Sequence, residues 1–286
     1  MGGDGVTRLV QISDLHITEG DRLTRGGADP RARTQALVAA IETLEERAGP
    51  IDGVVITGDL TDDGTVEQCV AARALLEPLL NRLHLVPGNH DTRSALSEVF
   101  PEHFCPVPED RGAGVAPPPL HWTRKIGGLT VVGLDTTVPD AAHGELDDRG
   151  FRILEDALET AQALVILMHH HPFDAGNRMM DARRLRDGEA LIDLVSSATN
   201  VRLLACGHVH RYVATTRGRV TCVAAPAASY ATMLDHREVA PAELMLDPPA
   251  LLLHVWDPEN DALVTSLAIA GDVPGPMPFF PSTGRP

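Results

Sequence analysis

The sequence predicts an α/β fold, and three observations support this prediction. Hydrophobic residues make up 43% of the 286 residues, which is enough for a buried core. Aromatic residues are only 3%, so the core is built from Leu, Val, Ile and Ala, a composition typical of parallel strands covered by helices. Apolar segments of strand length also alternate with amphipathic segments at helical spacing. Length alone leaves open one large domain or two small ones.

The strands and helices follow from these patterns in chain order. Apolar segments predict strands at residues 8–13, 53–57, 84–86, 129–134, 163–168 and 201–205. Helical spacing predicts helices at residues 30–48, 66–80, 147–161 and 189–197. Gly49 and Pro50 end the first helix, and Pro78 marks a kink or an early end in the second. Residues 219–224, 251–256 and 262–267 are predicted as later strands, the last two forming a hairpin.

The charge balance restricts the partners of the protein. Lys and Arg total 24 against 40 Asp and Glu, a formal charge of -16 at pH 7, which argues against nucleic-acid polymers and anionic membranes as partners. An anionic substrate remains compatible if divalent cations bind some of the carboxylates. The 4 cysteines show no regular spacing, and no secretory signal or membrane-length segment is visible, so we expect a cytoplasmic protein with reduced thiols.

Potential metal ligands follow five of the predicted strands. They are Asp14 and His16, Asp59, Asn89 and His90, the triplet His169 to His171, and His208 with His210. Each alone has an ordinary explanation, because Asp14 can cap a turn and any surface loop can hold a His-x-His pair. Their shared position after a strand, mostly beside glycine, favours a metal site, since open α/β sheets bind ligands at these ends. Of three adjacent histidines, at most two can face one point.

The number of donors indicates two metals. A single zinc needs about four donors, whereas at least seven are present here. Two ions sharing one carboxylate, about 4 Å apart, form the arrangement used for displacement at phosphorus. Mixed carboxylate, amide and imidazole donors suit Mn, Fe, Co or Zn, and these oxygen-rich partners argue against Cys206 as a ligand.

Five motifs together resemble the calcineurin-like metallophosphoesterase superfamily in identity and order, over residues 8–225. They are Asp14-x-His16, Gly58-Asp59, Gly88-Asn89-His90-Asp91, the His-His-Pro segment and Gly207-His208-x-His210. The sequence is most similar to the bacterial class III cyclic-nucleotide phosphodiesterase and glycerophosphodiesterase branch. The resemblance implies a four-layer α/β/β/α sandwich of two mixed β-sheets flanked by helices. It also implies a catalytic domain at residues 1–228, with residues 229–286 packing on it or on a second subunit of a homodimer or larger assembly.

The resemblance further implies a ligand set. One metal is held by Asp14, His16, Asp59 and His210, and a second metal shares Asp59 and takes Asn89, His170 and His208. The family ligand lies two residues before the proline, which selects His170. In that arrangement His169 points back into the protein and His171 points toward the following loop.

The implied reaction is attack of a metal-bridging hydroxide on a small phosphodiester, a 3′,5′-cyclic nucleotide or a glycerophosphodiester. His90, oriented by Asp91, protonates the leaving alkoxide or stabilises its charge. Asn89, His90 and Arg211 are predicted to contact substrate, although a solvated arginine after a turn explains Arg211 equally well. The same ordinary explanation applies to Arg33 and Arg93.

Alternative functions remain within and outside the superfamily. Inside it, the chain is alternatively a phosphomonoesterase, a phosphonate monoesterase or a nucleotide-diphospho-lipid hydrolase. Outside enzymes, it is a catalytically silent metal-binding scaffold, although every ligand position is filled. Specificity is expected in the loops at residues 18–29, 101–119 and 173–188, the last a predicted lid, and residues 273–286 are expected to form an arm or to be disordered.

Overall fold

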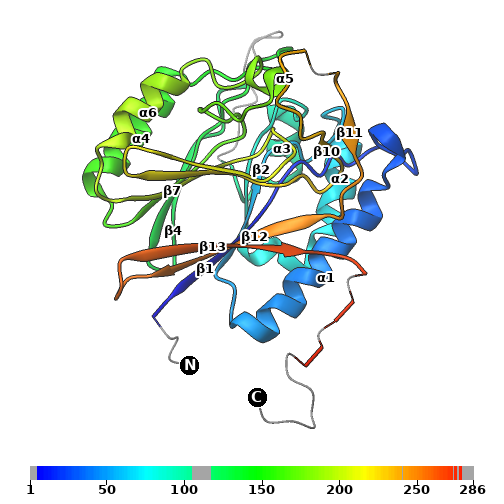
Figure 1. Ribbon diagram of the computed structural model, residues 1–286, viewed down its shortest axis with the longest axis horizontal. Helices are drawn as coiled ribbons and strands as arrows, with labels where there is room; N and C mark the ends of the chain where they lie inside the picture. Colours follow the sequence, from blue (N-terminus) through cyan, green and yellow to red (C-terminus); the bar gives the residue numbers. More distant parts are fainter. Residues whose placement is uncertain (1–4, 105–116, 240, 273, 276, 279–286) are drawn as a thin grey trace.

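Two mixed β-sheets stack face to face, with helices on both outer sides (Figure 1). The structure, a computed structural model, describes residues 5–104, 117–239, 241–272, 274–275 and 277–278. The predicted α/β/β/α sandwich is therefore confirmed. Most of the expected entrance loop at residues 101–119 and of the tail at residues 273–286 lies outside the described residues. Within them, no helix combines the length and apolar character needed to cross a membrane.

The first sheet has the strand order β13-β12-β1-β2-β3. Its parallel strands are β1 (Thr7–Ile12), β2 (Gly53–Thr57) and β3 (Leu83–Val86), and its antiparallel hairpin is β12 (Ala250–Asp257) with β13 (Ala262–Ile269). Because β12 pairs with β1, strands from the two ends of the chain lie side by side in this sheet. Its helices are α1 (Pro30–Ala48), α2 (Val66–Leu75) and α3 (Arg93–Val99), and the short helices η1 (Arg25–Gly27) and η2 (Glu77–Arg82) lie in the connections.

The second sheet has the order β4-β5-β6-β7-β9-β8. Its strands are β4 (Trp122–Ile126), β5 (Leu129–Gly133), β6 (Leu164–Leu167), β7 (Val201–Cys206), β8 (Val213–Arg217) and β9 (Val220–Ala224). The helices α4 (Asp148–Thr160) and α6 (Gly188–Ser196) cover its outer face, and α5 (Arg178–Asp181) lies in the predicted lid. A separate two-stranded ribbon consists of β10 (Ala231–Thr232) and β11 (Leu244–Met245).

The core is divided by the alternation of side chains along the second sheet. Val165, Leu167 and Leu203 point toward the first sheet and belong to the large cluster between the sheets. Their neighbours Ile166 and Leu204 point the other way and pack under α4 and α6. Strands buried on both faces read as continuous apolar runs, which is why β6 and β7 were visible in the sequence.

Most predicted boundaries are within two residues of the observed ones. Asp29 caps α1 by accepting hydrogen bonds from the first-turn amides of Arg31 and Ala32. The predicted helix at residues 66–80 ends early, at Leu75, because Pro78 cannot continue it. The strands β4 and β8 were missed, because each is only five residues long and three of the five are polar, so neither forms an apolar run in the sequence.

Candidate metal centre

The candidate donors lie together at the C-terminal ends of β1, β2, β3, β6 and β7, and several have an unusual backbone conformation. Seven non-glycine residues among those described have positive φ, and five of them are predicted ligands. These five are Asp14, His16, Asp59, His208 and His210. The left-handed conformation costs a non-glycine residue roughly 1–2 kcal/mol. Strain gathered on these positions is typical of a functional site.

A first donor set consists of Asp14, His16, Asp59 and His210, all buried. His16 Nε2 lies 3.1 Å from His210 Nε2 and 3.5 Å from Asp59 Oδ2. His210 Nε2 lies 3.3 Å from Asp14 Oδ1. Two donors bound to one ion at about 2.1 Å are themselves roughly 3.0–3.4 Å apart, so these separations fit a shared cation.

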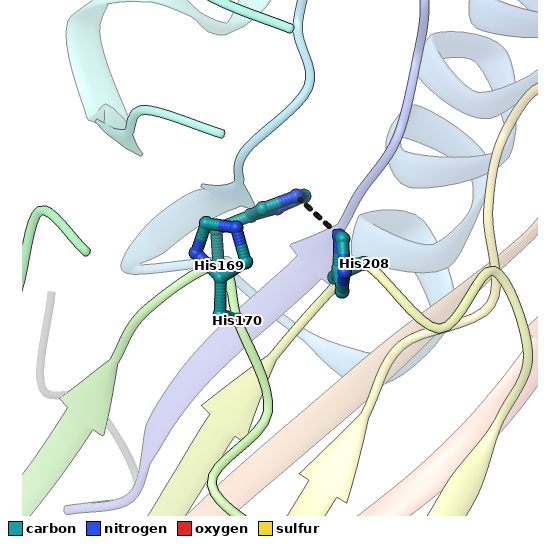
Figure 2. Close-up of side chains that lie close together, drawn as sticks. All are labelled: His169, His170 and His208. Carbon is teal, nitrogen blue, oxygen red and sulfur yellow. Dashed lines mark hydrogen bonds between the residues drawn. The ribbon is translucent and has the colours of Figure 1, made fainter. Parts of the chain in front are cut away.

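A second donor set lies directly beside the first. His169 Nε2 is 3.1 Å from Asn89 Oδ1, 3.4 Å from Asp59 Oδ2 and 3.2 Å from His208 Nδ1. Figure 2 shows His169 and His208 facing each other across this last contact. The same oxygen of Asp59 therefore faces both donor sets, as a bridging carboxylate would.

Oxygen acceptors fix the orientation of three of these histidines. The Nδ1 atoms of His169 and His210 each lie 2.8 Å from a backbone carbonyl, of Thr57 and Tyr230 respectively. Because a carbonyl only accepts, Nδ1 carries a proton in both rings, and Nε2 is the atom that faces the donor set. His16 Nδ1 lies 3.2 Å from a carboxylate oxygen of Asp62, the usual partner of a metal-binding imidazole.

The electrostatics also fit cation binding. Burial opposes ionisation of Asp59, yet His169 and His16 hold the pKa of this carboxyl well below its usual value. Burial alone would lower the pKa of His169, and the carboxylates of Asp59 and Asp14 raise it to about 9. The carboxylates are thus ionised beside positive charge, the environment that divalent cations supply. Burial, reinforced by His170, holds the pKa of His208 well below its usual value, so this ring stays neutral with a free lone pair.

The histidine triplet differs from the sequence-based prediction. His169 was expected to point back into the protein and is instead the ring that faces Asn89 and Asp59. The Thr57 carbonyl at the end of β2 holds it there. His170, the predicted ligand, places Nδ1 2.8 Å from Thr136 Oγ1, and its Nε2 is buried without a hydrogen-bond partner among the described residues. The geometry therefore favours His169, although His170 stays within the same cluster of ring nitrogens.

The neighbours of His90 also differ from the prediction. The Asp91 carboxylate, expected to orient His90, instead accepts hydrogen bonds from the amides of Gly88, Leu60 and Thr61. It thereby stabilises the loop after β3. His90 is oriented through its Nδ1, which lies 2.7 Å from the carbonyl oxygen of Asp62, and its amide donates to Asp59 Oδ1 over 2.9 Å.

The arginines predicted near substrate have structural partners. Arg211 donates through Nε and Nη2 to the carbonyl of Thr232, at 2.8 and 2.6 Å, and lines a small cavity away from the donors. Its predicted role in substrate binding is therefore not supported. Arg93 forms an ion pair with Asp135 at 2.7 Å, and Arg33 donates to backbone carbonyls, so both have structural partners and neither is the solvated arginine of the ordinary explanation.

Two glycines allow the loops to approach each other closely. A Cβ on Gly88 would lie 2.2 Å from Asp59 Oδ1, and one on Gly207 would lie 2.1 Å from Ser13 Oγ. Both contacts are impossible for a real side chain. The glycines next to Asn89 and His208 are therefore required by the close packing of the donor loops.

Two cavities open onto the donors. One, of about 270 Å³, is lined by Asp59, His208 and His210 together with Arg25 and Arg183. The other, of about 570 Å³, extends past Asp62 and Arg93. They share Asn89, His90 and Ala142, so both reach the same point beside the donors.

Sequence reasoning did not identify several residues of this centre. No sequence motif distinguishes Asp62 and Arg25 from ordinary charged residues of a protein surface. Thr57 and Tyr230 act through backbone carbonyls, for which side-chain identity gives no signal.

A sandwich of two sheets whose strand ends gather carboxylate, amide and imidazole donors has the architecture of a metallophosphoesterase. The calcineurin-like phosphoesterase family matches residues 7–212, and the chain belongs to this family. The predicted family, and with it a hydrolase of phosphoesters, is confirmed.

The chain is similar to a probable glycerophosphodiester phosphodiesterase GpdQ of Arcobacter nitrofigilis, 30% identical over 97% of this chain and 98% of the relative. It is also 30% identical to the 3′,5′-cyclic adenosine monophosphate phosphodiesterase CpdA of Pseudomonas aeruginosa, over 78% of this chain and 76% of that protein. Among solved structures, a dimetal phosphatase from Danio rerio aligns with a TM-score of 0.61 at 12% identity, covering 91% of this chain and 98% of the other. This last likeness concerns the fold alone.

Proposed function

We propose that the protein is a two-metal phosphodiesterase of small phosphodiesters, namely 3′,5′-cyclic nucleotides or glycerophosphodiesters. The observation that carries this proposal is the position of Asp59 Oδ2, within 3.5 Å of His16 Nε2 and 3.4 Å of His169 Nε2. A single carboxylate oxygen shared by two donor sets is what a pair of ions requires. The substrate classes are those named for the relatives that span most of the chain.

In this proposal each ion has four protein donors. Asp14, His16, Asp59 and His210 hold one ion, and Asp59, Asn89, His169 and His208 hold the other. His169 replaces the predicted His170. The donor chemistry suits Mn, Fe, Co or Zn. The bound ions would supply positive charge for the phosphate and lower the pKa of water at the site.

Protein side chains supply the remaining steps. Because His90 Nδ1 donates to the Asp62 carbonyl, Nε2 is the atom left to face the leaving alkoxide, and the imidazolium form of the ring would give its Nε2 proton to that oxygen and become neutral. Asn89 presents Oδ1 to its ion, so its amide NH₂ remains to donate to a phosphate oxygen. His90 and Asn89 lie where the two cavities meet, which is where both ester groups of a diester would diverge.

The location and partners are part of the same proposal. The free, buried thiols of Cys69, Cys206 and Cys222 support a reducing compartment, and we propose the cytoplasm. The charge of -16 supports a small substrate over a nucleic-acid polymer or an anionic membrane. Homodimers or larger assemblies, with residues 229–286 contributing to contacts, are also proposed, and light scattering on the purified protein tests them.

Metal analysis combined with a substrate panel tests the proposal. The wild type should bind two ions per chain and hydrolyse bis(4-nitrophenyl) phosphate faster than the monoester 4-nitrophenyl phosphate. Asp59→Asn should lose both ions and turnover, whereas Asp21→Asn, at an exposed aspartate, should match the wild type. Two bound ions without turnover of cyclic nucleotides, glycerophosphodiesters, phosphonates or nucleotide-diphospho-lipids would favour the silent scaffold. Faster monoester hydrolysis would favour a phosphomonoesterase.

A further inference from the structure

The two cavities beside the donors differ in charge. The larger one is lined by four carboxylates, of Asp62, Asp63, Asp91 and Asp140, and by one arginine, Arg93. Arg93 is paired with Asp135, and Asp62 and Asp63 are paired with Arg22, so Asp91 and Asp140 are the carboxylates of this cavity without an arginine partner among the described residues. The smaller one is lined by two arginines, Arg25 and Arg183, against one carboxylate, Asp59, which faces both donor sets. A substrate that occupies both cavities therefore meets opposite electrostatic fields on its two sides.

Arg25 lines the smaller cavity and has no partner for its charge among the described residues. Its guanidinium forms no hydrogen bond or ion pair within the described part of the chain. Its neighbour Arg22, by contrast, pairs with Asp62 and Asp63. In a chain with 40 acidic and 24 basic residues, an unpaired arginine lining the cavity over the donors is available for an anionic ligand.

The backbone that carries Arg25 is held in place. The amide and hydroxyl of Thr24 both donate to the carbonyl of Ala28, at 2.8 and 3.2 Å, which closes the turn around η1. Gly26 has φ 75°, and a Cβ there would lie 2.6 Å from Leu244 Cδ1, so this turn packs against β11. The exposed side chain of Arg25 therefore extends from a backbone segment that hydrogen bonds and packing hold in place.

Arg183 completes the positive side of the cavity. Its Nη1 donates to the carbonyl of Met179 over 2.6 Å, which orients the guanidinium while leaving its other donors free. The two arginines come from different segments, η1 and the loop after α5, and line the same 270 Å³ space.

We propose that Arg25, assisted by Arg183, selects phosphodiesters in which one ester substituent carries its own negative charge. That substituent lies in the cavity lined by Arg25, and the other, uncharged substituent lies in the acidic cavity. This proposal rests on the phosphodiesterase function proposed above. It makes Arg25 a specificity residue that contacts substrate away from the reacting bond.

A matched pair of chromogenic esters tests it. The 4-nitrophenyl phosphodiesters with a 2-carboxyethyl or a 2-carbamoylethyl second substituent have nearly the same shape and differ in one charge. The metal-loaded wild type should show a KM about five- to tenfold lower for the carboxylate, because charged hydrogen bonds are the stronger ones and this site is partly exposed. Raising NaCl from 0.1 to 0.5 M should reduce this preference.

Variants then assign the preference to Arg25. Arg25→Gln should bring the ratio of the two KM values close to one, Arg25→Lys should restore part of it, and Arg25→Glu should reverse it. Arg47→Gln, which removes an exposed arginine near the end of α1, controls for net charge and should keep the wild-type ratio.

The outcomes separate this proposal from the one on which it rests. Equal KM values for both esters in the wild type, or an Arg25→Gln variant that keeps the wild-type ratio, would overturn the role of Arg25 while leaving the phosphodiesterase intact. Absence of turnover for both esters in the metal-loaded wild type would overturn the phosphodiesterase proposal itself.

Discussion

Asp59 and His169 lie 3.4 Å apart, carboxylate oxygen to ring nitrogen, although they come from different sheets. Asp59 follows β2 of the first sheet and His169 follows β6 of the second. The Thr57 carbonyl, also at the end of β2, holds the His169 ring at 2.8 Å. The stacking of the two sheets is therefore what completes the second donor set, and neither sheet alone contains it.

This relationship predicts which histidine of the triplet binds metal. His169→Gln should retain one ion per chain or fewer, because the second donor set loses the ring that contacts both Asn89 and Asp59. His170→Gln is the matched control and should retain two ions, since its ring contacts Thr136. Metal content by mass spectrometry after gel filtration measures both. Retention of two ions by His169→Gln together with loss by His170→Gln would restore the assignment made from sequence.

His90 is predicted to act in chemistry and not in metal binding. His90→Ala should lower kcat by about 10²- to 10⁴-fold, the usual contribution of a general acid, with two ions retained. The Nδ1 contact with the Asp62 carbonyl is lost, but this residue supplies no donor to either set. Stopped assays with bis(4-nitrophenyl) phosphate, alongside metal analysis, give both readouts. Near-normal turnover would exclude this role.

The sequence predicted where the candidate donors lie because the strands that precede them are mostly apolar segments that could be recognised. Carboxyl ends of parallel strands lie at one edge of a sheet, so the sequence predicts that Asp14, Asp59 and Asn89 lie close together. The order of strands in the sheet was not needed for that step.

The choice within the histidine triplet could not be made in the same way. It depends on the Thr57 carbonyl from the other sheet and on the Thr136 hydroxyl after β5, and neither contact has a sequence pattern. The contact of Arg211 could not be predicted for a related reason, because its acceptor is a backbone carbonyl in the short strand β10, which the sequence did not predict.

The glycine before Asn89 gives a prediction about packing. Gly88→Ala places a Cβ 2.2 Å from Asp59 Oδ1, so either the loop or the carboxylate must move. We expect lower metal affinity and a lower melting temperature in the presence of metal. Gly128→Ala is the matched control, since the nearest atom to a Cβ there is 3.5 Å away, and it should leave metal content unchanged. Equal metal content in the two variants would show that the donor loops tolerate the displacement.

The buried histidine of β12 predicts how stability depends on pH. Burial lowers the pKa of His254 to about 3, and its neutral ring fits its neighbours, Nε2 donating to Gln11 and Nδ1 accepting from Thr265. In the unfolded chain, the His254 side chain binds a proton below about pH 6.5. In the folded chain, the same side chain stays neutral down to about pH 3. Above pH 6.5, His254 therefore does not lower the free energy of unfolding. Between about pH 6.5 and pH 3, the free energy of unfolding falls as the pH decreases.

The size of this effect follows from proton linkage. One extra proton bound by the unfolded state lowers the free energy of unfolding by at most about 1.4 kcal/mol per pH unit. His254→Gln cannot take up this proton and keeps an amide that can donate to Gln11. In urea titrations with chelator present, the wild type should therefore lose up to about 1.4 kcal/mol more per pH unit than the variant between pH 6 and pH 5. Parallel pH profiles for the two proteins would mean that His254 titrates normally in the folded state.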